Sequence, residues 1–306
     1  MNIESEKKLA AGLSIVSNST IIILKLIAGF VSGSISVISE AIHSMSDLLA
    51  SFLTFFSVLK SAKPADSDHP YGHGKYEDMS GFLEGILIIL AAVYIIYEAV
   101  QKLYLNKSPE IETLPGIIVM IAAVIANFLV SKYLFLVAKK SDSLSLLADA
   151  EHLNTDILSS AGVLAGLVLI KITGLHILDS VIAILVAAFI MRTGFFITKK
   201  ALNNLLDGSL PEENIETIEN VLDEFVKLKK IAGYKNLKSR RAGPKKNIEI
   251  TLFFSNDMKI YDCHKICDEI EDAIDSKLGG NTVVFIHAEP EAYCHRCSKK
   301  SYHRAV

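Results

Sequence analysis

The chain has little charge for its length. Only 21% of its 306 residues are Asp, Glu, Lys or Arg, whereas 51% are hydrophobic and the mean hydropathy is +0.38. This composition is unusual for a soluble enzyme of this size and favours a membrane protein. The sequence also has no basic cluster with interleaved aromatic residues, and its net charge is -3. We therefore expect no nucleic-acid partner.

Long apolar runs lie almost entirely before residue 200. Six of them are long enough, at about 1.5 Å per residue, to cross about 30 Å of hydrocarbon as helices. They cover approximately Leu9–Val31, Ile35–Leu59, Phe82–Leu103, Leu114–Val137, Leu144–Lys171 and Leu175–Ile197. The sequence therefore predicts an all-α bundle of six transmembrane helices over residues 1–206.

The connections between these runs indicate the orientation, because cytoplasmic loops are enriched in Lys and Arg. Nine lysines lie on the side of the two termini and three lie on the other side. No small-residue cleavage site ends the first run, so we expect it to be a retained span. We predict a multi-pass protein of the cell membrane (the inner or plasma membrane), surrounded by lipid, with both termini in the cytoplasm.

Residues 207–290 have the charge content of a soluble domain. Helical periodicity and β-rich runs follow one another in the order α-β-β-α-β. The expected elements are Glu212–Val226, Tyr234–Arg241, Asn247–Phe254, Tyr261–Leu278 and Thr282–His287. This order predicts a cytosolic α+β domain close to a ferredoxin-like fold, followed by a Cys- and His-containing tail over residues 291–306.

Two histidine–aspartate pairs interrupt the apolar runs with the same spacing. His43 and Asp47 are four residues apart in the second run, and His152 and Asp156 repeat this spacing in the fifth. Residues four apart share one face of a helix. Asp47 and His152 both lie roughly 18 Å from the predicted cytosolic surface, so the pairs can meet. Ionisable groups are costly inside a membrane, so matched pairs at one depth favour a functional site over two isolated interhelical hydrogen bonds.

The four side chains offer two imidazole nitrogens and two carboxylate oxygens. This donor set suits tetrahedral zinc and also accepts cadmium, cobalt, nickel or ferrous iron. Without metal the site would hold two buried carboxylates, so we expect it to bind protons instead. The sequence thus predicts export of a divalent metal with protons as counter-ions. The metal is substrate and possible regulator, and no prosthetic group is expected.

Two further groups of residues could bind metal. Asp66, His69 and His73 lie in the predicted cytosolic loop after the second span, where glycines let the backbone fold round an ion. The second group comprises all the cysteines of the chain: Cys263, Cys267, Cys294 and Cys297. In the cytosol thiols stay reduced, so these four could form one zinc site that senses metal. Alternatively, the first two are small core residues and the tail binds metal only adventitiously.

In these features the chain resembles the cation diffusion facilitators, which are proton-coupled metal exporters. The resemblance rests on the six spans, the two His-x-x-x-Asp pairs, the loop His73-Gly74-Lys75 and the cytosolic α+β domain. It implies a homodimer that works by alternating access, with the transported ion held by the second and fifth spans. It also implies that Asp66, His69 and His73 form a metal site.

The resemblance extends in part to metal binding by the cytosolic domain. His264, His287 and Glu289 match positions that hold metal between paired domains of zinc exporters. Members with a full two-ion site also have histidines where this chain has Lys235 and Thr251. The resemblance therefore supports one ion in this metal-binding and dimerisation domain and leaves a second ion open.

Two alternatives to a transporter stay open at this stage. A membrane-anchored metal sensor or scaffold would use the same cytosolic ligands, but a passive anchor would have no reason to bear the cost of buried charges. An intramembrane metalloenzyme would need a vacant coordination position, and four protein ligands leave none. The sequence also has no His-Glu-x-x-His motif, so we expect no enzymatic activity.

Overall fold

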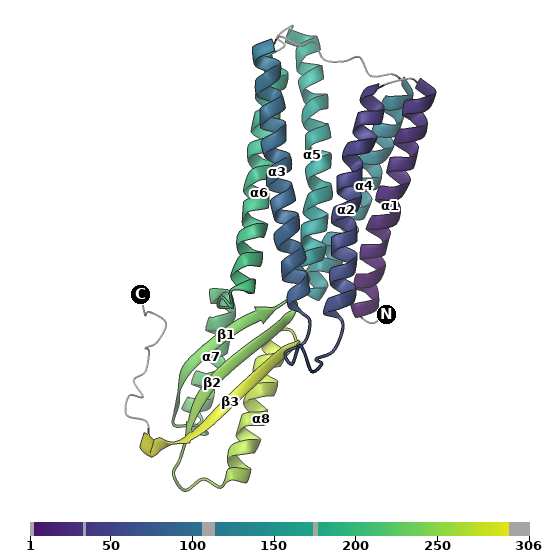
Figure 1. The fold of residues 1–306 in the computed structure, drawn as a ribbon. Helices are drawn as coiled ribbons and strands as arrows, with labels where there is room; N and C mark the ends of the chain where they lie inside the picture. Colours follow the sequence, from purple (N-terminus) through teal and green to yellow (C-terminus); the bar gives the residue numbers. More distant parts are fainter. Residues whose placement is uncertain (1–2, 33–34, 106–113, 174–176, 294–306) are drawn as a thin grey trace. The chain divides into compact units, whose positions relative to one another are not determined.

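The computed structural model describes residues 3–32, 35–105, 114–173 and 177–293. The chain divides into two compact units, Met1–Leu202 and Asn203–Val306 (Figure 1). The first unit is helical, and the second contains a small sheet.

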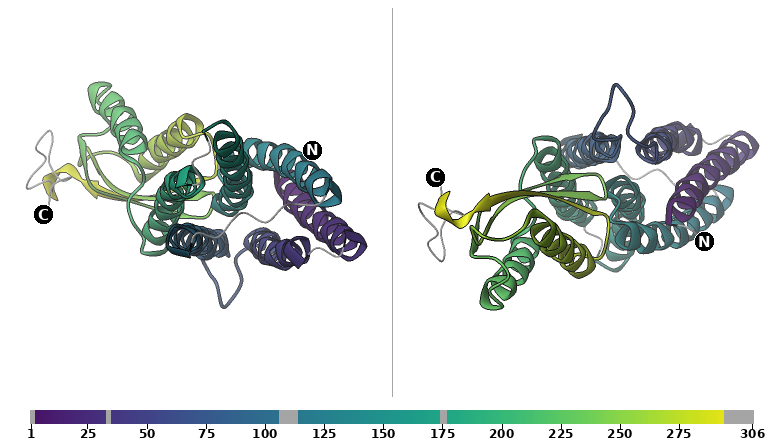
Figure 2. Two further views of the ribbon diagram at one scale, coloured as in Figure 1. Left: turned by 90° about the horizontal axis from the view of Figure 1, so that it is seen from above. Right: turned by 90° about the horizontal axis from the view of Figure 1, so that it is seen from below.

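Long helices make up the described part of the first unit (Figures 1 and 2). They are α1 (Ile3–Ser32), α2 (Ile35–Ser61), α3 (Lys75–Leu105), α4 (Leu114–Ser141), α5 (Leu144–Thr173) and α6 (Ile177–Leu205). By length and composition, the described segments Ile3–Ala28, Lys75–Gln101 and Ile121–Ser141 are apolar enough to cross a membrane.

Several helices extend beyond the apolar runs of the sequence. Helix α1 begins at Ile3 rather than Leu9, and α3 begins at Lys75 rather than Phe82. Helix α6 continues to Leu205. Apolar runs report only the length that suits hydrocarbon, whereas backbone hydrogen bonds sustain a helix into water when its residues are good helix formers.

The packing of the first unit leaves apolar side chains on both its inside and its outside. Helix α1 packs against α2 and α4, and α5 packs against α2, α3 and α4. Val58, Leu134 and Leu153 are buried where these helices meet. Large apolar side chains are also exposed on the outer faces, among them Val16 and Phe195. This distribution is costly in water and favourable in hydrocarbon, as a membrane-spanning unit requires.

Helices α3 and α6 approach each other closely at two glycines. A Cβ atom on Gly85 would lie 2.9 Å from the backbone nitrogen of Thr198, and one on Gly194 would lie 2.9 Å from Cγ1 of Ile89. The hydroxyl of Thr198 donates a hydrogen bond to the carbonyl oxygen of Gly194 at 2.8 Å. Small residues allow such backbone contact between membrane helices.

The second unit has two layers, one of helices and one of strands. Its elements are α7 (Glu212–Lys227), β1 (Gly233–Ala242), β2 (Lys245–Phe254), α8 (Ile260–Lys277), β3 (Thr282–Pro290) and a 3-10 turn (Glu291–Tyr293). Strand β1 pairs antiparallel with β2, which pairs parallel with β3. Both helices cover the same face of this sheet (Figure 2).

The apolar core of the second unit lies between these two layers. Ile218 and Leu222 of α7, Ile270 and Ile274 of α8, and Ile248 of β2 are fully buried there. The element order is the α-β-β-α-β order expected from the sequence. Strand β3 continues past the predicted end at His287, because its backbone stays paired with β2 as far as Pro290.

The close approach of α3 and α6 predicts that Gly85→Ala destabilises the helical unit. The added methyl would force the backbone at Thr198 to move, at a cost of about 1–3 kcal/mol. Gly12→Ala is the matched control, since a Cβ atom there would lie 3.8 Å from the ring of Phe55. The measurement is the unfolding temperature of the full chain in detergent. Equal values for the two variants would contradict the α3–α6 contact.

Candidate metal centre

The two histidine–aspartate pairs lie on helices that pack against each other. His43 and Asp47 belong to α2, and His152 and Asp156 belong to α5. These two helices are in contact. His152 is buried, at 5% exposure, and Asp156 is partly buried. The side chains of His43 and Asp47 lie outside the described residues, so a shared four-ligand centre stays a prediction.

The loop between α2 and α3 brings Asp66, His69 and His73 together. One ligand atom from each lies within 4.8 Å of the others, and no other such group of three is found in the described ranges. Oδ1 of Asp66 lies 3.3 Å from Nδ1 of His69, and Oδ2 lies 3.4 Å from Nε2 of His73. One carboxylate and two imidazoles form a donor set that suits zinc, with room for a fourth ligand.

Local backbone hydrogen bonds fold this loop into its compact form. Oδ1 of Asp66 accepts a hydrogen bond of 2.7 Å from the backbone N–H of His69, which lowers the pKa of the Asp66 carboxyl. Gly72 has φ +86°, a value that disfavours side chains, and its N–H donates to the carbonyl oxygen of His69. Nδ1 of His73 lies 3.2 Å from the carbonyl oxygen of Pro64. A hydrogen bond to one imidazole nitrogen orients the other toward a ligand.

The sheet of the second unit places Lys235, Thr251 and His287 side by side on β1, β2 and β3. Nζ of Lys235 donates a hydrogen bond of 2.9 Å to Oε2 of Glu289 and lowers the pKa of that carboxyl. Oε1 of Glu289 lies 3.3 Å from Nε2 of His287. A lysine ammonium therefore already partners the carboxylate that the family resemblance assigns to metal.

His264 does not join this group within one chain. It lies on α8, is 75% exposed, and has Nδ1 3.7 Å from Oδ1 of Asp268. In the part of the chain that the structure covers, His264, His287 and Glu289 do not form a cluster with ligand atoms within 4.8 Å. A site containing all three stays a prediction.

The cysteines on α8 contribute to packing. Cys263 and Cys267 lie against the apolar core of the second unit. Burial raises the pKa of Cys263 and raises that of Cys267 to about 11, so both are protonated thiols near neutral pH. Metal would have to displace these protons. Cys294 and Cys297 lie outside the described residues, and the four-thiol site stays a prediction.

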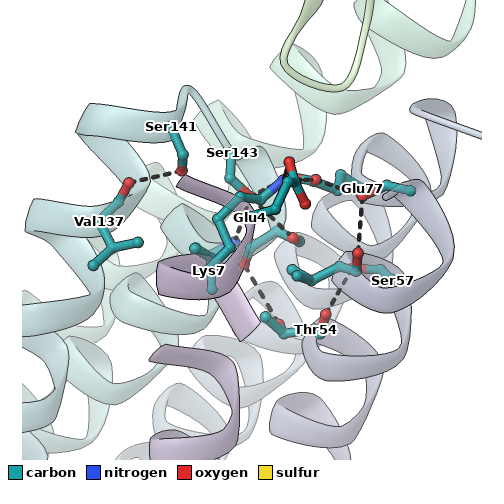
Figure 3. Close-up of polar contacts among 12 residues, drawn as sticks. Glu4, Lys7, Thr54, Ser57, Glu77, Val137, Ser141 and Ser143 are labelled. Atoms are coloured by element: carbon teal, nitrogen blue, oxygen red, sulfur yellow. Dashed lines mark hydrogen bonds and ion pairs between the residues drawn. The ribbon is translucent and has the colours of Figure 1, made fainter. Parts of the chain in front are cut away.

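The sequence did not reveal a buried polar network where α1 begins and α2 ends. Nζ of Lys7 contacts Oε1 of Glu77, which also accepts a hydrogen bond of 2.7 Å from Ser61. Ser143 donates to the other carboxylate oxygen (Figure 3). Lys7 is 1% and Glu77 0% exposed. Lys7 and Glu77 both lie outside the six apolar runs, so the cost of burying charge in a membrane gave no reason to single them out.

A second buried acid, Asp149, was also missed. It lies on α5 three residues before His152 and is 0% exposed. That spacing, which places both on one helix face, was the available signal. Glu84 of α3 accepts a hydrogen bond of 2.5 Å from Thr54 of α2.

Comparison with known families assigns both units. Residues 12–206 match the cation efflux transmembrane domain, and residues 210–291 match the cytoplasmic domain of cation efflux proteins. The chain belongs to the cation efflux family, the cation diffusion facilitators. The resemblance found in the sequence is confirmed.

Relatives of this cation efflux protein match it over most of their length. The transporter sll1263 of Synechocystis sp. is 34% identical, with 87% of this chain and 85% of that protein covered. The transporter MJ0449 of Methanocaldococcus jannaschii is 32% identical, with 90% and 93% covered. The cation-efflux pump FieF of Cronobacter sakazakii is 27% identical, with 88% of each chain covered. A solved structure of CzrB in its zinc form is 34% identical over 29% of this chain and 97% of that chain, with a TM-score of 0.27.

The family assignment settles the broad class. Its members are cation efflux transporters and not enzymes, which confirms the expectation for this chain. A cation efflux protein with these apolar helices is a multi-pass membrane protein.

The loop geometry predicts that Asp66→Asn and His73→Ala each weaken zinc binding at the loop. Each change removes one of three convergent ligands and should weaken binding at the loop roughly tenfold or more. Asp68→Asn is the matched control, because Asp68 lies in the same loop outside the ligand group. Zinc titration of the purified full chain measures the effect. Equal loss in the Asp68 variant, or none in the other two, would contradict a loop site.

Proposed function

We propose that this cation efflux protein exports a divalent transition metal, zinc above all, from the cytoplasm in exchange for protons. The observation that carries the proposal is the packing of α5 against α2, because α5 holds His152 and Asp156 inside the membrane unit and α2 carries the matching pair. His43, Asp47, His152 and Asp156 together are the proposed transport ligands.

The donor chemistry favours zinc. Two nitrogens and two carboxylate oxygens suit a tetrahedral, borderline-soft ion, and two Asp charges balance a divalent cation. Cadmium, cobalt, nickel and ferrous iron can use the same set. The coordination geometry and the availability of each metal, rather than affinity alone, select among these ions.

Proton coupling is proposed because the carboxylates cannot stay ionised and uncompensated when metal leaves. Burial disfavours the charged form of a carboxyl group, so protons should replace the departing ion. Each cycle would then return protons to the cytoplasm as metal is exported. The protons act as counter-ions, and the metal is the substrate.

The topology and assembly are proposed from several sources. We infer six membrane spans and a cytosolic, ferredoxin-like second unit in a cell-membrane protein, with both termini in the cytoplasm, as the lysine distribution favours. We infer a homodimer that works by alternating access. The family model of the cytoplasmic domain carries the name of a dimerisation domain, which supports pairing.

The remaining metal ligands are proposed to be regulatory. The loop site of Asp66, His69 and His73 would bind ions at the membrane surface. His264, His287 and Glu289 would bind a single ion between paired cytosolic domains, where metal would have to displace Lys235 from Glu289. The four cysteines would tie the tail to α8 when metal is abundant.

A membrane-anchored metal sensor is the second candidate. The convergent ligands of the loop favour it, because a sensor would bind metal there without moving it. The buried His152 and Asp149 disfavour it, since an anchor gains nothing from ionisable groups in its interior.

Zinc uptake into proteoliposomes by ligand variants separates the two. We expect His43→Ala, Asp47→Ala, His152→Ala and Asp156→Ala each to lower the uptake rate at least about a hundredfold, because loss of one ligand leaves an incomplete, uncompensated site. Asn154→Ala is the control, since Asn154 shares α5 but contacts Glu151. Near-normal uptake by folded His152→Ala or Asp156→Ala would contradict the proposal. Zinc binding without uptake by the unmodified chain would favour the sensor.

A further inference from the structure

A second acidic pair lies inside the helical unit, between the Lys7–Glu77 contact and the proposed transport ligands. Glu84 lies on α3, two helical turns beyond Glu77, and Asp149 lies on α5, one turn before His152. Both carboxylates are fully buried. They interact electrostatically with each other, and Glu84 also interacts with His152. The pair is therefore part of one continuous polar interior.

Hydroxyl groups of α2 and α3 hold Glu84 on one side only. Oε1 accepts hydrogen bonds from Thr54 at 2.5 Å and from Ser80 at 2.8 Å. Oε2 is buried, and it has no hydrogen-bond partner among the described residues. Burying an unsatisfied carboxylate oxygen is costly, so this oxygen requires either a proton or a bound cation.

Asp149 contacts a serine of α2, which in turn is held from α1. Ser51 of α2 lies 3.3 Å from Oδ1 of Asp149 and also accepts a hydrogen bond of 2.8 Å from Asn18 of α1. Ser14 of α1 lies 2.9 Å from the same hydroxyl. These side chains are all at least 96% buried. Helices α1, α2, α3 and α5 thus contribute polar groups to this buried position.

The oxygens of this cluster continue the helix faces that carry the transport ligands. Ser51 follows Asp47 by four residues on α2, and Asp149 precedes His152 by three on α5. Residues at these spacings share a face. Both steps lead toward the ends of α2 and α5 that are predicted to be cytosolic. An ion moving from the cytoplasm to the transport ligands would therefore pass between Glu84 and Asp149.

We propose that Glu84 and Asp149, with the hydroxyls of Ser51 and Thr54, form an intermediate binding position for the metal on its way to the transport ligands. The position rests on the proposed export function. Its donors are all oxygen, which hold a borderline-soft ion less tightly than a set with two imidazoles. The affinity for the ion therefore rises between the intermediate position and the transport ligands, one helical turn further on.

The first test measures zinc uptake by the full chain in proteoliposomes over a range of zinc concentrations. Glu84→Gln and Asp149→Asn should each raise the half-saturating concentration roughly tenfold, because one charge of the intermediate binding position is lost. Glu84→Asp keeps the charge, so its half-saturating concentration should stay close to that of the unmodified chain. Glu151→Gln is the control, since Glu151 is a carboxylate of α5 whose partner is Asn154. An unchanged half-saturating concentration with a lowered maximal rate would show a structural role and overturn the proposal.

The second test does not depend on transport. In a full chain with Asp47→Ala, Asp156→Ala and Asp66→Ala, adding Glu84→Gln should remove one weakly bound zinc ion from the stoichiometry found by equilibrium dialysis. An unchanged stoichiometry overturns the intermediate position even where export holds. Failure of the unmodified chain to move zinc, together with loss of this ion, would refute the proposed function and leave the binding position supported.

Discussion

The cost of an ionised carboxylate in an apolar interior governs the arrangement of the helical unit. Each buried acid needs a cation, a proton or several hydrogen bonds, because the surrounding hydrocarbon offers no water. Glu77 has a permanent cation in Lys7 and two serine hydroxyls. Glu84 has hydroxyls on one oxygen alone. The buried acids therefore differ in how completely the protein's own groups compensate the carboxylate. A mobile cation can bind where this compensation is least complete.

In the second unit a partly exposed carboxylate also has a cation supplied by the chain. There, Lys235 supplies an ammonium group to Glu289, at a sheet position level with Thr251 and His287. Because the ammonium group of Lys235 is part of the chain, it neutralises the Glu289 carboxylate even when the metal concentration is low. The loop of Asp66, His69 and His73 has no such lysine within its ligand group and offers its donors directly to an ion.

Much of this structure could be predicted from local sequence patterns. Apolar runs located the long helices, and alternating patterns gave the α-β-β-α-β order. The spacing within the loop predicted that Asp66, His69 and His73 could meet, and they do. The contacts that could not be predicted join residues of different helices, and the sequence does not show which helices pack together. Lys7 and Glu77 are 70 residues apart, and Thr54 and Glu84 are 30 apart. Asp149 lies five residues into its apolar run, and its burial depends on the serine of α2 that packs against it. The partnership of Lys235 and Glu289 joins residues that are 54 apart and requires β1 and β3 both to pair with β2.

The proposed transport requires that metal and protons exchange at the buried carboxylates. The direct measurement follows zinc uptake and internal pH at the same time in proteoliposomes that contain the full chain and a trapped pH indicator. We expect zinc entry to drive protons out and to make the lumen more alkaline, and we expect both fluxes to vanish together in Asp156→Ala. Zinc entry with no change in internal pH would contradict it.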